Sequence, residues 1–153
     1  MTFFKELFSN ELFVSAAAAW FLAQILKTII HSLITKDFNI ERMYGSGGMP
    51  SSHSATVTAL ATSSYFLYGA ASSEFAISII MAIIVMYDAR GVRLETGIQA
   101  KVLNDLIELL ADVHNEIMPL DEKLKEFVGH TPLQVIVGAI LGFIVSCITH
   151  FNF

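Results

Sequence analysis

The segment Leu12–Thr35, LFVSAAAAWFLAQILKTIIHSLIT, decides the fold class of this chain. As a helix it would be about 36 Å long, enough to cross the ~30 Å hydrocarbon core of a bilayer. Hydrophobic residues make up 54% of the 153 residues and charged residues 15%, whereas soluble domains average roughly 45–50% and 25%. The composition therefore favours an all-α integral membrane protein. The alternative, apolar core helices of a soluble bundle, fits it less well.

Three shorter apolar segments, at about 54–70, 75–89 and 133–149, predict about four spanning helices in a single domain covering 1–153. Gly138 and Gly142 form a G-x-x-x-G pair that suits close approach of helices, with Ser146 one turn further on. Between the last two spans, the stretch of about 99–117 reads as an amphipathic helix, lying at the membrane surface or on a partner. The small-residue helix faces or this amphipathic helix are also the surfaces on which we expect any homo-oligomer.

An even number of spans places the loop 36–52 and the polar region 90–129 on one side of the membrane. Of the nine Lys and Arg residues, seven fall in these two regions: Lys36, Arg42, Arg90, Arg93, Lys101, Lys123 and Lys125. The positive-inside rule then predicts a multi-pass protein of the cell membrane with this side in the cytoplasm. Any of these cations that take part in catalysis would weaken the inference about orientation. The net charge of −5 argues against a nucleic-acid partner.

Two histidines stand at predicted helix starts on this shared side. His53 ends the turn Gly47-Gly48-Met49-Pro50-Ser51-Ser52-His53-Ser54, in which glycine, small hydroxyl side chains and a helix N-terminus favour a bound anion. Ser51 and Ser52 can alternatively cap the helix. His130 precedes Pro132, which suits a first helical turn, and Gln134 lies one turn further on, where it can hydrogen-bond the imidazole ring. Two histidines can share the nucleophile and acid roles of phosphoryl transfer at neutral pH.

These strings resemble a known family. Pro50-Ser51-Ser52-His53 is similar to the P-S-G-H motif of the type 2 phosphatidic acid phosphatase and vanadium haloperoxidase superfamily. The combination of G-G-M-P-S-S-H-S, Y-D-A-x-G-V-R and G-H-T-P resembles its divergent branch of small membrane proteins. These strings stand here at 47–54, 87–93 and 129–132. The resemblance covers nearly the whole chain.

The resemblance implies a metal-independent phosphatase, without a cofactor, that acts on a lipid phosphate or diphosphate held in the bilayer. His130 would be the nucleophile that forms a phosphohistidine, and His53 the general acid. Ser51 and Ser52 would hold phosphoryl oxygens. Gln134 stands where the family has an orienting Asp, so it can accept a hydrogen bond but contributes no negative charge. Vanadium-dependent halide oxidation has no support in this sequence.

The family's basic motifs are only approximated, so the phosphate-binding cations must be assigned anew. Arg90 and Arg93 are the first choice because guanidinium groups suit phosphate oxygens, followed by Arg42 and Lys36 and then by Lys123. Structural roles are the other interpretation for several polar residues: an ion pair for Asp88 and surface positions for His114 and His150. Lys27 and His31 make helix–helix contacts or line a headgroup passage, and we favour the contacts. A non-catalytic protein that binds or transports phosphorylated headgroups is the alternative function, supported by Gln134.

Overall fold

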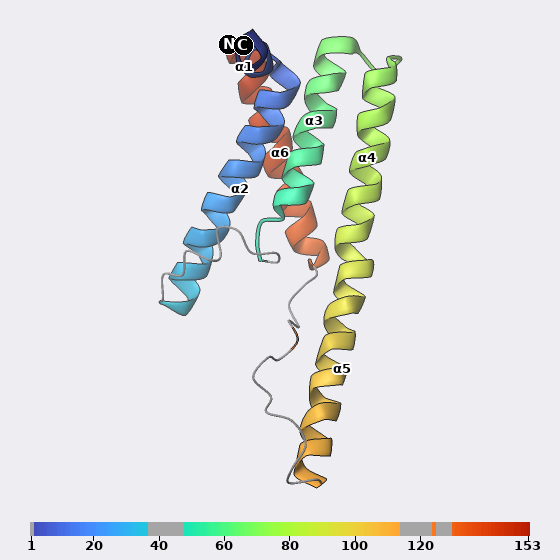
Figure 1. The fold of residues 1–153 in the computed structure, drawn as a ribbon. Coiled ribbons are helices and arrows are strands. Elements are labelled where there is room, and N and C mark those ends of the chain that lie inside the picture. The colour runs from blue at the N-terminus through green and yellow to red at the C-terminus, as the bar shows by residue number, and fades with distance from the viewer. Residues whose placement is uncertain (1, 37–47, 114–123, 125–129) are drawn as a thin grey trace.

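The computed structural model describes residues 2–36, 48–113, 124 and 130–153, except for the side chains of 92–94 and 110–113. The regular structure in this part of the chain is entirely helical, which confirms the all-α prediction. The helices are α1 (Thr2–Phe8), α2 (Glu11–Thr35), α3 (Ser52–Tyr68), α4 (Ser73–Arg90), α5 (Val92–Val113) and α6 (Pro132–Asn152). Figure 1 shows α2, α3, α4 and α6 side by side, with both termini at one end of the bundle.

Three stretches are long and apolar enough to span a membrane. They are Glu11–Thr35, Ser73–Leu109 and Pro132–Asn152. They coincide with three of the four expected spans, each beginning within about two residues of the expected start. Ser73–Leu109 runs through α4 and into α5, well beyond the expected end at about 89. The fourth expected span, at about 54–70, corresponds to α3, which has 17 residues and a length of about 25 Å. The chain is therefore an α-helical membrane protein with three candidate spans.

The helix α3 lies at the centre of the bundle and packs against α2, α4 and α6. Small side chains line these interfaces because helices in a bilayer gain stability from close packing rather than from hydrophobic exclusion of water. One buried cluster joins α2, α3 and α6, and a second joins α3 to α4. Their members are Ala19, Ala23, Ala55, Ala59 and Val145 in the first cluster, and Val57, Ala61 and Ala82 in the second.

The closest contact in the bundle is between α6 and the start of α3. A Cβ atom added to Gly138 would overlap the carbonyl oxygen of Ser51 and lie 3.1 Å from the Cβ of Ser54. One added to Gly142 would overlap the carbonyl of Ala55. One turn further along α6, the hydroxyl of Ser146 forms a 2.8 Å hydrogen bond with that of Ser63. The G-x-x-x-G pair is thus in contact with α3 within the chain, and the homo-oligomer stays a prediction.

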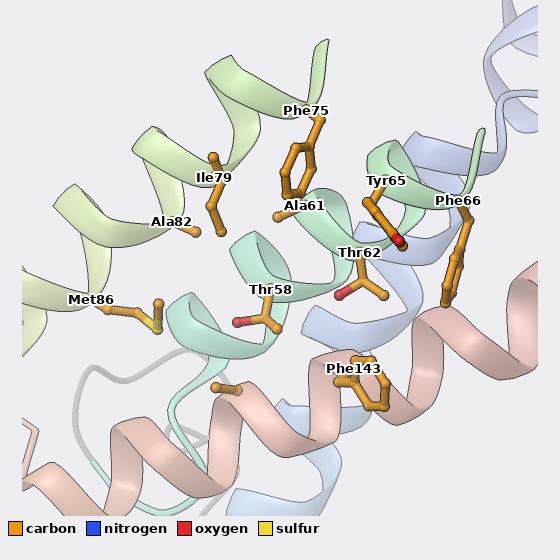
Figure 2. Close-up of a pocket in the computed structure, with 11 residues that line it drawn as sticks. Thr58, Ala61, Thr62, Tyr65, Phe66, Phe75, Ile79, Ala82, Met86 and Phe143 are labelled. Atoms are coloured by element: carbon orange, nitrogen blue, oxygen red, sulfur yellow. The ribbon is translucent and has the colours of Figure 1, made fainter. Parts of the chain in front are cut away.

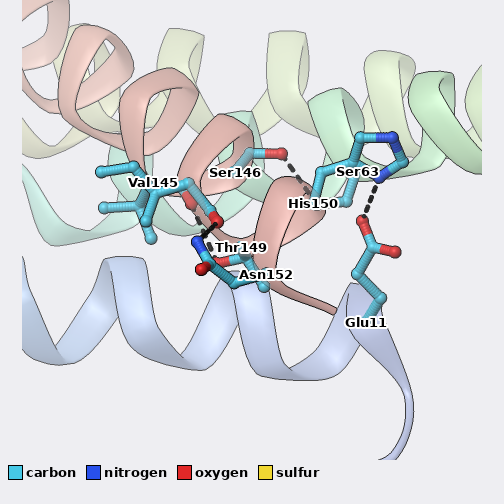
Figure 3. A network of polar contacts seen from close by, with 8 residues as sticks. Glu11, Ser63, Val145, Ser146, Thr149, His150 and Asn152 are labelled. Atoms are coloured by element: carbon cyan, nitrogen blue, oxygen red, sulfur yellow. Dashed lines mark hydrogen bonds and ion pairs between the residues drawn. The ribbon is translucent and has the colours of Figure 1, made fainter.

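The polar contacts at the end of the bundle that holds the termini differ from the sequence prediction. His150, expected at the surface, lies with its Nδ1 2.8 Å from Oε1 of Glu11, whose side chain is buried (Figure 3). Its ring also stacks on Phe66 at a centroid distance of 4.9 Å. The reason is that α2 begins and α6 ends at this level, so the polar ends of both helices meet.

The amphipathic helix also differs from the prediction. It begins at Val92 rather than at about Gln99, because Gly91 alone separates it from α4. Figure 1 shows α5 continuing beyond the bundle in line with α4. Asn104, buried in this helix, bonds both the N–H and the C=O of Leu124 at 3.0 Å. The expected end of the helix at about 117 lies outside the described residues.

The contact between α3 and α6 predicts a specific sensitivity. Gly142→Val should destabilise the protein by about 3 kcal/mol or more, because no side chain fits against the Ala55 carbonyl. Ile144→Val, an exposed position on the same helix, should change the stability by less than about 1 kcal/mol. Thermal unfolding in detergent measures both variants. Equal stability of the two variants would contradict the contact.

Candidate two-histidine site

The two histidines singled out in the sequence lie together at the end of the bundle opposite the termini. Their ring centroids are 6.1 Å apart, and the rings make an angle of 61°. His53 is the second residue of α3, and His130 stands directly before Thr131, the N-cap of α6. Because α6 packs closely against the first turns of α3, the two helix starts bring these side chains face to edge.

His130 is buried and is bonded to both α4 and α6. Its side chain is buried, with a relative exposure of 1%. Its backbone N–H donates to the carbonyl of Ala89 at the end of α4, at 3.1 Å. Its Nδ1 lies 3.2 Å from Oε1 of Gln134, which confirms the expected contact between ring and amide.

Gln134 determines the tautomer of His130. Its Oε1 also accepts a hydrogen bond from the backbone N–H of Thr131 at 3.1 Å, so this atom is an acceptor. The ring can then bond to Oε1 only by donating from Nδ1. In the neutral ring this leaves the lone pair on Nε2, the nitrogen that faces away from Gln134.

The start of α6 fixes this geometry through its own cap. The Thr131 hydroxyl accepts a hydrogen bond from the N–H of Gln134, and the Gln134 side chain accepts one from the N–H of Thr131. These two bonds form a capping box, with Pro132 in the first turn of the helix. The spacing T-x-x-Q is the signal for this motif, and the sequence analysis missed it. Gln134 therefore has two tasks, helix capping and ring orientation.

The start of α3 is hydrogen-bonded to the first turn of α6. The N–H of Ser51 donates to the carbonyl of Gln134 at 3.0 Å, and the Ser51 hydroxyl accepts from the N–H and the hydroxyl of Ser54. Ser51 therefore caps α3, as the alternative interpretation held. Ser52 is buried in the first turn, where backbone N–H groups have no partner within the helix. Anion binding by Ser51 and Ser52 stays a prediction.

A cavity of about 270 Å³ adjoins His53. It is lined by His53, Ile84, Val85, Asp88 and Ala89. Its wall includes Ala89, whose carbonyl accepts a hydrogen bond from the backbone N–H of His130, but His130 itself does not line it. Asp88, for which the sequence suggested only an ion pair, is half-buried and shares this cavity with His53.

Lys27 is a cation of this region for which the sequence analysis favoured a structural role over lining a headgroup passage. It is 4% exposed in the middle of α2. Its side-chain carbons lie 3.1 and 3.4 Å from the position that a Cβ on Gly48 would occupy. Gly48 has a φ of +89°, a conformation that glycine adopts without strain. The lysine stem thus packs on the glycine turn that leads to Ser51 and His53.

Comparison with known proteins shows the family of this chain. The sequence model of the Divergent PAP2 family matches residues 8–145. The chain belongs to the divergent PAP2 family. It is also 37% identical over 156 residues to the "Uncharacterized membrane protein YuiD" of Bacillus subtilis (strain 168), covering 97% of this chain and 99% of that protein. No solved structure matches it.

The structure describes only some of the cations that the sequence analysis proposed for phosphate binding. Arg90 ends α4 next to Ala89 and is exposed. Lys36 ends α2 in a left-handed conformation, more than two turns beyond Lys27, and is exposed. Arg93 lies in the first turn of α5, but its side chain is outside the described part. Arg42 and Lys123 lie outside the described residues. Lys27 is thus the buried lysine that the described structure brings to the glycine turn.

The tautomer of His130 can be tested directly. In ¹⁵N-histidine-labelled protein at a pH where the ring is neutral, the spectrum should show His130 protonated on Nδ1. Gln134→Leu should remove this preference, because it deletes the acceptor Oε1. Solid-state NMR in bilayers measures the nitrogen shifts. A neutral His130 protonated on Nε2 in the unmodified protein would contradict the inference.

Proposed function

We propose that this chain is a metal-independent phosphatase that removes the phosphate of a lipid phosphate or diphosphate through a phosphohistidine on His130. The observation that carries this proposal is the pairing of His53 with His130 at a ring distance of 6.1 Å, with Nδ1 of His130 engaged by Gln134. A reacting group held between two catalytic side chains needs contacts of about 3 Å to each. Membership of the divergent PAP2 family supports the reaction class.

In the first step the Nε2 lone pair of His130 attacks phosphorus, and the P–O bond to the lipid alcohol breaks. Protonated His53 donates its proton to the departing alkoxide, so that a neutral alcohol leaves. In the second step a water molecule attacks the phosphohistidine and gives a proton to His53. The P–N bond then breaks. The sum is one ester and one water converted to one alcohol and one phosphate.

Lys27 is our candidate for the cation that neutralises phosphoryl oxygens. A buried ammonium group acts more strongly on an anion than an exposed one, because water screens it less. Lys27 is buried against the turn that precedes His53, whereas Arg90 and Lys36 are exposed. Arg90 remains a candidate through its place next to Ala89, where it can approach a headgroup from the aqueous side.

The membrane arrangement that we propose has four crossings, with the histidines at the cytoplasmic end. Both termini lie at one end of the bundle, which requires an even number of crossings if α2, α4 and α6 all span (Figure 1). The 17 residues of α3 fall at the lower limit for a span. This helix is surrounded by the other three, so it meets little lipid.

Binding or transport of phosphorylated headgroups without hydrolysis is the second candidate function. Gln134 favours it, because an amide cannot stabilise a positive imidazolium as the family's carboxylate does. Replacing a carboxylate by an amide in a comparable triad costs about 10⁴-fold in rate. A slow but measurable turnover would therefore still agree with the phosphatase proposal.

Release of inorganic phosphate from a panel of lipid phosphates tests the enzyme proposal. His130→Ala should abolish turnover, and His53→Ala should lower it by about 10²-fold or more, because it removes the general acid. His150→Gln is the matched control, since His150 lies at the other end of the bundle. In the same assay Lys27→Met should raise KM.

No release from any substrate by the unmodified protein, with headgroup binding retained, would contradict the phosphatase and favour the second candidate. Unchanged turnover in His130→Ala would contradict the assignment of the nucleophile.

Cysteine labelling tests the topology. In a Cys147→Ser background, Glu95→Cys should react with an impermeant thiol reagent only after the cells are permeabilised, because Glu95 follows the histidine end of α4. Ser9→Cys, at the other end, should react in intact cells. Both positions are exposed in the structure. The reverse pattern would place the histidines outside.

A further inference from the structure

A groove lies between α3, α4 and α6. It extends from near the histidine end of the bundle towards the end that holds the termini. Its volume is about 500 Å³. Apolar side chains from all three helices form most of its wall, as Figure 2 shows. The lining residues that the argument uses are Thr58, Tyr65, Phe75, Ala82, Met86 and Ala139.

The groove begins close to the two-histidine site. Met86 lies one turn before Ala89, whose carbonyl binds the backbone of His130. Ala139 follows Gly138, which contacts the carbonyl of Ser51. A molecule with its phosphate at the histidines would therefore have its apolar part directed into the groove.

The wall of the groove has an unpartnered hydroxyl near the histidine end and two aromatic rings at the far end. Thr58, near the histidine end, has a buried hydroxyl oxygen with no hydrogen-bond partner in the described structure. Such an atom costs free energy that a ligand oxygen would recover. At the far end stand the rings of Tyr65 and Phe75, 5.5 Å apart. Thr62 and the Tyr65 hydroxyl add polar atoms further along, but the wall is otherwise apolar and suits a hydrocarbon chain.

The dimensions suit one hydrocarbon chain. Phe75 and Met86 are about 16 Å apart along α4, which is about half of the ~30 Å hydrocarbon core. Dividing 500 Å³ by this length gives a mean cross-section of about 31 Å². A single chain with carbon contacts at 3.5–4.0 Å needs roughly 15–20 Å², so one chain fits along the whole groove.

We propose that this groove holds one hydrocarbon chain of the phosphorylated substrate, and that Tyr65 and Phe75 set the longest chain that it accepts. The proposal rests on the phosphatase function for the headgroup, but the groove assignment can be tested without turnover. Since extended C–C bonds advance about 1.25 Å each, the groove accommodates about twelve or thirteen carbons.

Photo-crosslinking tests occupancy in the full-length His130→Ala protein, which cannot turn over. The probe is a dodecyl phosphate with a terminal diazirine, and mass spectrometry identifies the labelled peptides. Labels should fall within the three lining segments, 58–66, 75–86 and 139–143. Ala139→Phe should reduce them about fivefold or more, because the added ring occupies the groove. Ile140→Phe, on an exposed face outside the groove, is the matched control and should label normally.

Chain-length dependence tests the limit set by the aromatic pair. For monomeric alkyl phosphates in water, kcat/KM should rise by up to about fourfold per methylene and then level off when the groove is full. Phe75→Ala should move this plateau to chains longer by about two methylenes or more, because it removes a ring from the far end. Ile77→Ala, exposed on another face of α4, should leave the plateau in place.

The outcomes separate the two proposals. Groove labelling without phosphate release from any substrate would refute the phosphatase and leave the chain site standing. Labelling elsewhere, or labelling in the groove that Ala139→Phe and Ile140→Phe reduce equally, would overturn the chain site. A plateau that stays unchanged in Phe75→Ala would overturn the role of the aromatic pair.

Discussion

The contact between the backbones of α3 and α6 is the constraint on which the rest of the structure depends. Gly138 and Gly142 leave no space for a side chain, so the two helices meet at the carbonyls of Ser51 and Ala55. In a bilayer such contacts hold helices together through dispersion and close-range polar interactions. The hydrogen bond from Ser146 to Ser63 continues the same line of contact. This contact sets the height of the start of α6 relative to the start of α3.

That alignment turns two helix caps into one site. Ser51 caps α3 and donates its N–H to Gln134, while Gln134 caps α6 and orients the ring of His130. The same amide oxygen thus links helix stability to the tautomer of the candidate nucleophile. Because the cap and the ring share this acceptor, a change at Gln134 affects both. The helix α4 completes the site from the third side, through the carbonyl of Ala89 and the cavity that Asp88 lines.

The sequence predicted the helices and the histidine pair because apolar runs and short motifs are local signals. It could not predict Lys27 at the glycine turn, since the contact joins α2 to residue 48 across a stretch with no periodic pattern. It missed the early start of α5 because a single glycine interrupts a helix without ending it. The Glu11–His150 pair was also missed, since it depends on where α2 begins relative to the end of α6. The misses at Lys27 and at the Glu11–His150 pair concern the relative position of helices, which no single segment encodes.

The central claim is that one phosphoryl group sits between His130 and His53 with Nε2 of His130 as its attacking atom. An experimental structure of the protein in a lipid nanodisc with bound vanadate tests this most directly, because vanadate adopts the five-coordinate geometry of the transferring phosphoryl group. The account predicts vanadium bonded to Nε2 of His130, with an oxygen hydrogen-bonded to His53 and with Nδ1 still donating to Gln134. Vanadate bound away from both rings, or bonded to His53 instead of His130, would contradict it.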